Sequence, residues 1–220
     1  MKLKDKFSES DLQRIKQAVK DAEDKISGEI VPVIVERSGH YSIALYKSAL
    51  VFATIGFIFM IVFDRYLIED ASNTLYYDPV FIFFVVLSSG LLGVLLGMVS
   101  DSFKRLFISR RHFDEWTRIG AEAAFLEEEV FNTRHRTGIM IFISFFEHKV
   151  IVMADRGISK VVEQREWDAL VASLVGFIRQ GKPAEGIEAG IRRCGEILLE
   201  KGFHKTADDI NELRDDLRIN

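Results

Sequence analysis

An uninterrupted apolar run from Pro79 to Val99 constrains this chain more than any other feature. It reads PVFIFFVVLSSGLLGVLLGMV and contains no charged side chain. At a rise of about 1.5 Å per residue, a helix of this length spans roughly 30 Å, the thickness of the hydrocarbon core of a bilayer. The run therefore predicts a transmembrane helix.

A second apolar run lies before it, from Ser48 to Phe63, and lengthens to Ser42 if the Lys47 ammonium reaches the membrane interface. Residues 64–78 between the runs are mostly polar and form a short connection. We therefore expect two antiparallel neighbours, a transmembrane helical hairpin within residues 41–100, with the lipid bilayer as a partner.

The flanking charges predict the orientation of this hairpin. The connecting segment carries one cation, Arg65, among several carboxylates, whereas cations gather beside the other ends of the spans: Arg37, Lys47, Lys104, Arg105, Arg110 and Arg111. The positive-inside rule then places both termini and the polar domain in the cytoplasm and the loop 64–78 outside. We expect an integral protein of a bacterial inner membrane.

Small residues on the two spans indicate a close contact between helices. Gly93 and Gly97 are four residues apart, Ser89 lies four residues earlier, and Ala49 and Ala53 give the first span a similar face. Two interpretations remain open. The small residues form the contact within one hairpin, or two chains self-associate through Ser89, Gly93 and Gly97.

Composition excludes some classes of function. The formal net charge of −4 argues against a nucleic-acid partner, because phosphate contacts need clustered Lys and Arg side chains. Cys194 is the only cysteine, so no disulfide can form within the chain. The first residues, MKLKDKFSESD, include no apolar segment, and we expect no cleavable signal peptide.

The segment before the hairpin predicts one helix and one strand. Ser8 and Asp11 have the spacing of a capping box, and the apolar residues after them recur at helical spacing: Leu12, Ile15, Val19, Ala22 and Ile26. Residues 29–36, EIVPVIVE, are rich in β-branched side chains and predict a strand. Because Pro32 cannot donate to a strand ladder, we expect an edge strand or a bulge there.

The segment after the hairpin predicts a helix over 113–130, a buried central strand over 138–146 and an antiparallel partner over 149–154. Two amphipathic helices follow, near 164–179 and from Pro183 to Gly202. Neither side of the hairpin can bury its own apolar faces. We therefore expect one α/β domain of residues 1–40 and 101–220, with a small mixed sheet sandwiched by helices and interrupted by the hairpin.

The order of these motifs resembles the TPM domain, named after a thylakoid lumen protein, a photosystem II assembly factor and a receptor-associated membrane protein. Three segments carry the resemblance: SGEIVPVIV, NTRHRTGIMIFISFFEHKVIVMADRGI and FIRQGKPAEGIEAGI. The resemblance implies a small sheet between helices, together with divalent-cation binding, phosphatase activity or upkeep of membrane complexes. The chain departs from the family pattern in its internal hairpin and in Arg214, which stands where proline usually follows Asn-Glu-Leu.

Asp155 is the main candidate for a metal ligand. It directly follows a predicted strand, where ligands of α/β sheets tend to lie, and Gly157 permits a tight turn. Ca²⁺ and Mg²⁺ need several oxygen ligands, and the further candidates are Glu29, Asn132, Asp208 and Asp209. Alternatively, Asp155 caps the following turn and pairs with an arginine.

A basic loop and turn offer candidates for contact with phosphate: Arg134, Arg136 and Arg156. His135 and His148 have the chemistry of general acids, although such loop histidines are more often simply solvated. The sequence contains no P-loop, GxGxxG, HExxH or nucleophile-elbow motif.

Two functions follow from these features. The first is a non-catalytic, membrane-anchored accessory protein that binds a divalent cation, contacts a membrane protein and assists assembly or maintenance of membrane complexes. The alternative is a metal-dependent phosphatase, motivated by Asp155 and the loop with Arg134 and Arg136. We prefer the first, because one carboxylate without an evident nucleophile or second ligand is thin support for phosphatase chemistry.

Cysteine labelling tests the expected orientation. In a chain whose Cys194 is replaced, Asn73→Cys should react in intact cells with a thiol reagent that does not cross the membrane, because residues 64–78 are expected outside. A Lys160→Cys control in the same background should react only after the cells are opened. Protection of the cysteine at position 73 until lysis would contradict the positive-inside assignment.

Overall fold

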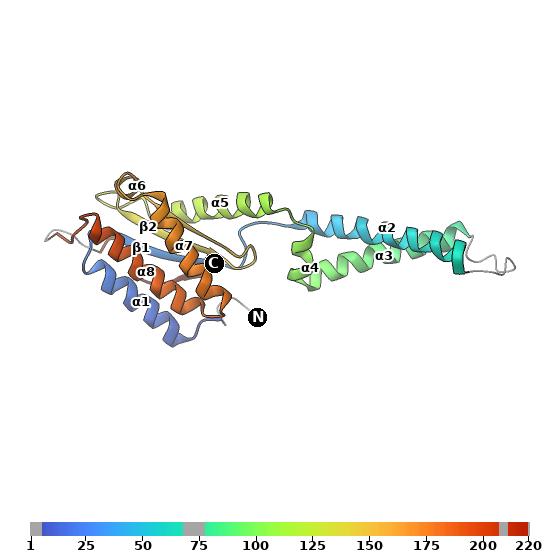
Figure 1. The fold of residues 1–220 in the computed structure, drawn as a ribbon, viewed down its shortest axis with the longest axis horizontal. Coiled ribbons are helices and arrows are strands. Elements are labelled where there is room, and N and C mark those ends of the chain that lie inside the picture. The colour runs from blue at the N-terminus through green and yellow to red at the C-terminus, as the bar shows by residue number, and fades with distance from the viewer. Residues whose placement is uncertain (1–5, 68–77, 207–210, 220) are drawn as a thin grey trace. The chain divides into compact units, whose positions relative to one another are not determined.

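The computed structural model describes residues 6–67, 78–206 and 211–219 (Figure 1). The chain divides into two compact units. The first comprises Met1–Gly39 and Asp114–Asn220, and the second comprises His40–Phe113. The second unit is thus inserted in the sequence between the two parts of the first.

The first unit is built on a four-stranded sheet in the order β3-β2-β1-β4. Strand β1, Glu29–Val35, pairs in parallel with β2, Gly138–Ser144, from Glu29 opposite Gly138 to Val35 opposite Ser144. Strand β3, Lys149–Ala154, is antiparallel to β2, and the short β4, Arg218–Ile219, is parallel to β1. Segments from both sides of the insertion therefore form one mixed sheet, and the α/β class is confirmed.

The neighbours of β1 correct one prediction. An edge strand or a bulge was expected at Pro32, but β1 lies between β2 and β4. Pro32 lacks an N–H that could donate to a second neighbouring strand, but no such donor is needed there. Pro32 lies opposite Ile141 of β2, and β4 pairs only with Val33 and Ile34. The prediction for β2 is confirmed: every residue of this strand is buried, and it lies between two partners.

One face of the sheet is covered by three helices: α1, Glu9–Glu23; α7, Gln164–Arg179; and α8, Pro183–Glu200 (Figure 1). Helix α1 begins with the predicted capping box, in which the Asp11 backbone N–H donates to Ser8 Oγ and the Ser8 backbone N–H donates to the Asp11 carboxylate. The main core cluster joins these helices to β1 and β2 through fully buried side chains that include Ile15, Ile30, Ile141 and Ile187.

The opposite face of the sheet packs against α5, Arg110–Glu127. Ala121 and Ala124 of this helix lie in a second cluster with Val31, Met140 and Phe142. The short α6, Arg156–Ser159, follows β3. Successive side chains of a strand point to opposite faces of the sheet, so the apolar strands contribute to two separate cores, one on each side.

The second unit contains α2, Ser42–Leu67, α3, Pro79–Val99, and the short α4, Asp101–Leu106. Residues 42–63 and 79–99 are long and apolar enough to cross a membrane, and only 17% of the most apolar window of each is buried. A core helix of a water-soluble protein would be mostly covered. The exposure of these apolar side chains is what a lipid-facing helix needs.

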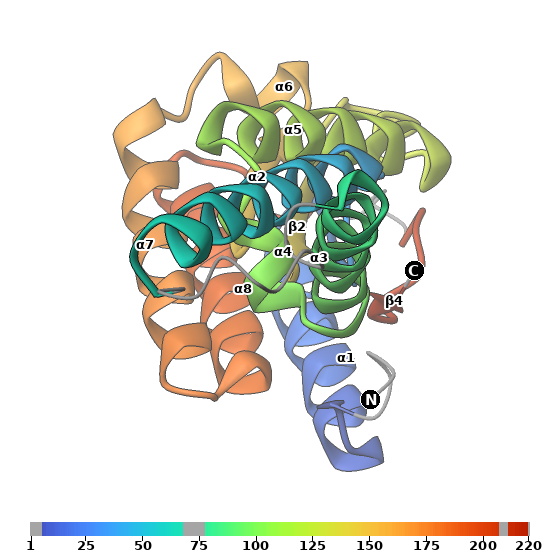
Figure 2. The same cartoon turned by 90° about the vertical axis from the view of Figure 1, so that its right-hand side faces the viewer.

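Helices α2 and α3 lie side by side (Figure 2). They are antiparallel, because Gly56 of α2 lies next to Ser89 and Gly97 of α3 lies next to Leu45. A Cβ atom added to Gly93 would lie 2.6 Å from the Ser48 carbonyl oxygen, so the close approach requires glycine. In this chain the small residues therefore form the contact within the hairpin. Self-association of two chains through the same residues stays a prediction.

Candidate functional site

One edge of the sheet collects most of the residues that the sequence singles out. Strands β1 and β2 begin at this edge with Glu29 and Gly138, and β3 ends there just before Asp155, whose backbone N–H donates to the Gly138 carbonyl at 2.9 Å. The pairing therefore brings Glu29 and Asp155 to the same edge of the sheet. Glu29 lies on β1 and Asp155 directly follows β3, the two strands that flank β2. What each carboxylate contacts there differs.

The Asp155 carboxylate contacts its own turn after β3 and the loop that precedes β2. Its Oδ1 accepts from the Arg156 backbone N–H at 2.7 Å and so caps α6, and its Oδ2 lies 2.7 Å from Arg136 Nε. Asp155 is 5% exposed. This is the capping and pairing role that the sequence left open as the alternative to a metal ligand, and it also engages Arg136, a candidate for phosphate contact.

The other predicted ligands are not assembled around Asp155. The exposed Asn132 donates from its side-chain amide to Glu129 Oε2 at 3.1 Å. Asp208 and Asp209 lie outside the described residues. The backbone N–H of Arg134 donates to the Glu212 carboxylate at 3.0 Å, so this part of the basic loop binds the C-terminal segment. The roles of Arg134 and Arg156 toward phosphate stay predictions.

Glu29 is fixed by the C-terminal segment. The Glu212 backbone N–H donates to Glu29 Oε1, and the Leu213 backbone N–H donates to Glu29 Oε2, both at 3.1 Å. Glu29 as a whole is 6% exposed. The Asn-Glu-Leu sequence thus closes over the start of β1, and the segment after it reaches the sheet as β4, with Arg218 Nε paired to Glu128 at 3.0 Å.

Glu23, at the end of α1, is the functional candidate that sequence reasoning missed. Its Oε1 accepts from the Ile30 backbone N–H at 2.8 Å, whereas Oε2 is buried without a hydrogen-bond partner among the described residues. The residue is 7% exposed. A buried carboxylate oxygen without a partner is costly, so this atom needs an explanation.

The signal for Glu23 is present in the sequence. It lies four and eight residues after Val19 and Ile15, on the apolar stripe of α1, where an acidic side chain must be buried. Asn211 and Lys205 carried no such signal, because only the folded chain brings the C-terminal segment to the end of α1.

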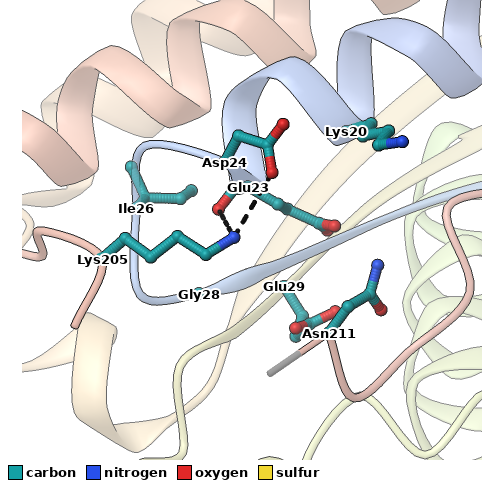
Figure 3. A pocket seen from close by; sticks show the side chains of 8 residues that line it. All are labelled: Lys20, Glu23, Asp24, Ile26, Gly28, Glu29, Lys205 and Asn211. Atoms are coloured by element: carbon teal, nitrogen blue, oxygen red, sulfur yellow. Dashed lines mark hydrogen bonds and ion pairs between the residues drawn. The ribbon is translucent and has the colours of Figure 1, made fainter. Parts of the chain in front are cut away.

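Glu23 and Glu29 line one pocket of about 140 Å³ together with Lys20, Asp24, Ile26, Gly28, Lys205 and Asn211 (Figure 3). The Lys205 ammonium reaches the Glu23 main-chain carbonyl at 3.1 Å and Asp24 Oδ1 at 3.4 Å. It is therefore bound beside the pocket and does not pair with the Glu23 carboxylate. The volume accommodates several water molecules or a partly hydrated ion.

The surroundings of Glu23 favour its protonated form. Burial raises the pKa of its carboxyl from the ordinary value of 4.5 to about 9, and the negative charge of Glu29 adds to the rise. The hydrogen bond from the Ile30 backbone opposes this shift, and the more distant Lys205 ammonium opposes it least. The folded protein therefore favours a proton on this carboxylate.

The fold and this pocket define a mixed α/β protein in which two buried carboxylates, Glu23 and Glu29, line one pocket. The chain matches no family model and no curated protein sequence. Its structure is similar to the NMR structure of the BA42 protein from the psychrophilic bacterium Bizionia argentinensis, with a TM-score of 0.57 and 19% sequence identity over 97% of this chain and 95% of that one. At this identity the similarity shows the fold alone.

The raised pKa of Glu23 predicts a pH dependence of stability. Between pH 4.5 and about 9 the folded state keeps a proton that the unfolded state loses, so the free energy of unfolding should fall as pH rises, by at most about 1.4 kcal/mol per pH unit. Glu23→Gln keeps an acceptor for the Ile30 N–H and removes this titration. The variant should be more stable than the wild type at pH 8 and show a flatter slope.

Guanidinium titrations of the full chain in mild detergent, followed by the fluorescence of Trp116 and Trp167, measure this free energy, because both tryptophans lie in the first unit. Asp24→Asn is the matched control, because Asp24 follows Glu23 in the sequence and its side chain is 62% exposed. It should leave the slope unchanged. A Glu23→Gln variant with the wild-type slope would show that Glu23 is ionised in the folded protein.

Proposed function

We propose that this protein is a non-catalytic, membrane-anchored accessory protein whose α/β domain binds Ca²⁺ or Mg²⁺ at the pocket of Glu23 and Glu29. In this proposal the hairpin of α2 and α3 spans the inner membrane of a bacterium, with the termini and the α/β domain in the cytoplasm. The protein then assists assembly or maintenance of membrane protein complexes, as the resemblance to the TPM domain implies.

The observation that carries the cation proposal is the unpaired buried Oε2 of Glu23 in a pocket shared with a second carboxylate. Glu29 lines the same pocket, and its two oxygens are held in place by the backbone N–H groups of Glu212 and Leu213. Asn211 lines the same pocket and carries an amide oxygen. Carboxylate and amide oxygens suit hard divalent cations, with water supplying the remaining ligands.

The donor set is small. Among the described residues, no group of three or more His, Cys, Asp or Glu side chains has the arrangement of a metal site. Two carboxylates with several coordinated waters are typical of weak or Mg²⁺-like binding. We therefore expect modest affinity and a role in fastening α1, β1 and the C-terminal segment together.

The alternative of a metal-dependent phosphatase gains no specific support from the site geometry. It was motivated by Asp155 beside the Arg134–Arg136 loop, and Asp155 and Arg136 bind each other. A phosphatase remains an alternative that the experiment below distinguishes.

Cation-dependent stability tests the proposal. Ca²⁺ or Mg²⁺ should raise the free energy of unfolding of the full chain in detergent, by about 2.7 kcal/mol at a cation concentration one hundred times the dissociation constant. Glu23→Gln and Glu29→Gln should each abolish most of this increase. Asp155→Asn, which changes a buried carboxylate at the same sheet edge and keeps an N-cap acceptor, should retain it.

Two results would contradict the proposal. The first is a stability unaffected by either cation, or an increase that survives in the double variant of Glu23 and Glu29. The second is cation-dependent hydrolysis of p-nitrophenyl phosphate that disappears in Asp155→Asn, which would favour the phosphatase.

A further inference from the structure

Five cationic side chains of the second unit lie near the start of α2, in α4 and in the first turn of α5. We call them the basic collar: Lys47, Lys104, Arg105, Arg110 and Arg111. Lys47 Nζ lies 3.4 Å from the Phe107 carbonyl oxygen, so the start of α2 is tied to the end of α4. Residues 100–113 include a single carboxylate, Asp101, and the collar therefore concentrates positive charge in a chain whose net charge is −4.

The collar cations differ from those of the adjoining first unit. Lys149 pairs with Asp114 at 2.7 Å, and Arg118 lies 3.8 Å from Glu122. By contrast, no ion pair within the described part of the chain involves Lys104, Arg110 or Arg111, and the two arginines are exposed. Their charges are thus available to an external anion.

Aromatic and apolar side chains accompany these charges. The helical direction breaks at Ser100, whose Oγ accepts from the Phe103 backbone N–H at 3.2 Å and begins α4. The Phe103 ring packs against Phe52 of α2 at 5.8 Å and against Phe107 at 5.2 Å between ring centroids. Next to Lys104 and Arg105, Leu106 is 77% exposed. Basic side chains beside exposed apolar ones are typical of a segment in the membrane interface.

From these observations we propose that the basic collar binds the phosphate headgroups of anionic phospholipids. The proposal rests on the hairpin spanning a membrane, as proposed above. The charges of the collar complement an anionic headgroup. The apolar surface of α2 and α3 continues directly into the collar, and Leu106 can enter the acyl boundary beside the collar. The collar then selects which lipids surround the hairpin, in addition to orienting it.

Electron paramagnetic resonance of spin-labelled lipids tests this selection. The full chain is reconstituted in phosphatidylcholine bilayers that contain a trace of labelled phosphatidylglycerol or labelled phosphatidylcholine. The motionally restricted fraction should show a preference for phosphatidylglycerol of roughly fivefold for each cation that contacts a headgroup, falling as salt is raised to about 0.5 M. Equal association of the two lipids, or a preference that high salt leaves unchanged, would overturn the proposal.

A triple variant locates the preference. Lys104→Gln, Arg110→Gln and Arg111→Gln together should reduce it to near unity, whereas the matched exposed control Lys160→Gln, Arg165→Gln and Arg179→Gln should keep it. A collar variant with the wild-type preference would overturn the assignment of lipid binding to the collar. If the variant does not reconstitute, the salt series on the wild type decides whether the lipid preference is electrostatic. A wild-type chain that stays outside the bilayer would refute the membrane proposal itself, whereas insertion without a preference refutes only the collar.

Discussion

The parallel pairing of β1 with β2 is the constraint on which the rest of the structure depends. It joins residues 29–35 to residues 138–144, so the chain must leave the domain after β1, complete the helices of the second unit and return through α5 before the sheet can close. The closure entropy of so long a connection grows only slowly with its length. Two separate cores, one on each face of the sheet, supply the apolar burial that offsets it.

The same pairing creates the candidate site. It sets Glu29 at the sheet edge, where the C-terminal segment donates two backbone N–H groups to it, and the end of α1 sets Glu23 over the first residues of β1. Two carboxylates buried so close together oppose folding unless one is protonated or a cation binds. A proton on Glu23 avoids this cost below a pH of about 9, and a ligand in the pocket would strengthen the junction of three segments that are distant in sequence.

Local signals in the sequence were sufficient to predict most of the elements. The capping box of α1, the continuous apolar run of β2 and the amphipathic stripes of α7 and α8 all reflect interactions within a few residues. The site was less predictable, because its geometry depends on tertiary pairing. Asp155 follows a strand, as a metal ligand often does, yet its carboxylate pairs with Arg136. Lys205 and Asn211 line the pocket of Glu23 only because the chain folds back on itself. The sequence predicts an edge strand or a bulge at Pro32, whereas the fold accommodates Pro32 between two strands because β4 is too short to pair with it.

Amide hydrogen exchange of the full chain in detergent tests the central claim, that the segment before the hairpin is an integral part of one sheet. The amides of Val31 and Val33 should exchange with the same free energy as those of Ile139 to Ile143, because both strands are released only when the whole sheet unfolds. Fast exchange of the β1 amides while β2 and β3 stay protected would contradict the account, since β1 would then be a separable segment.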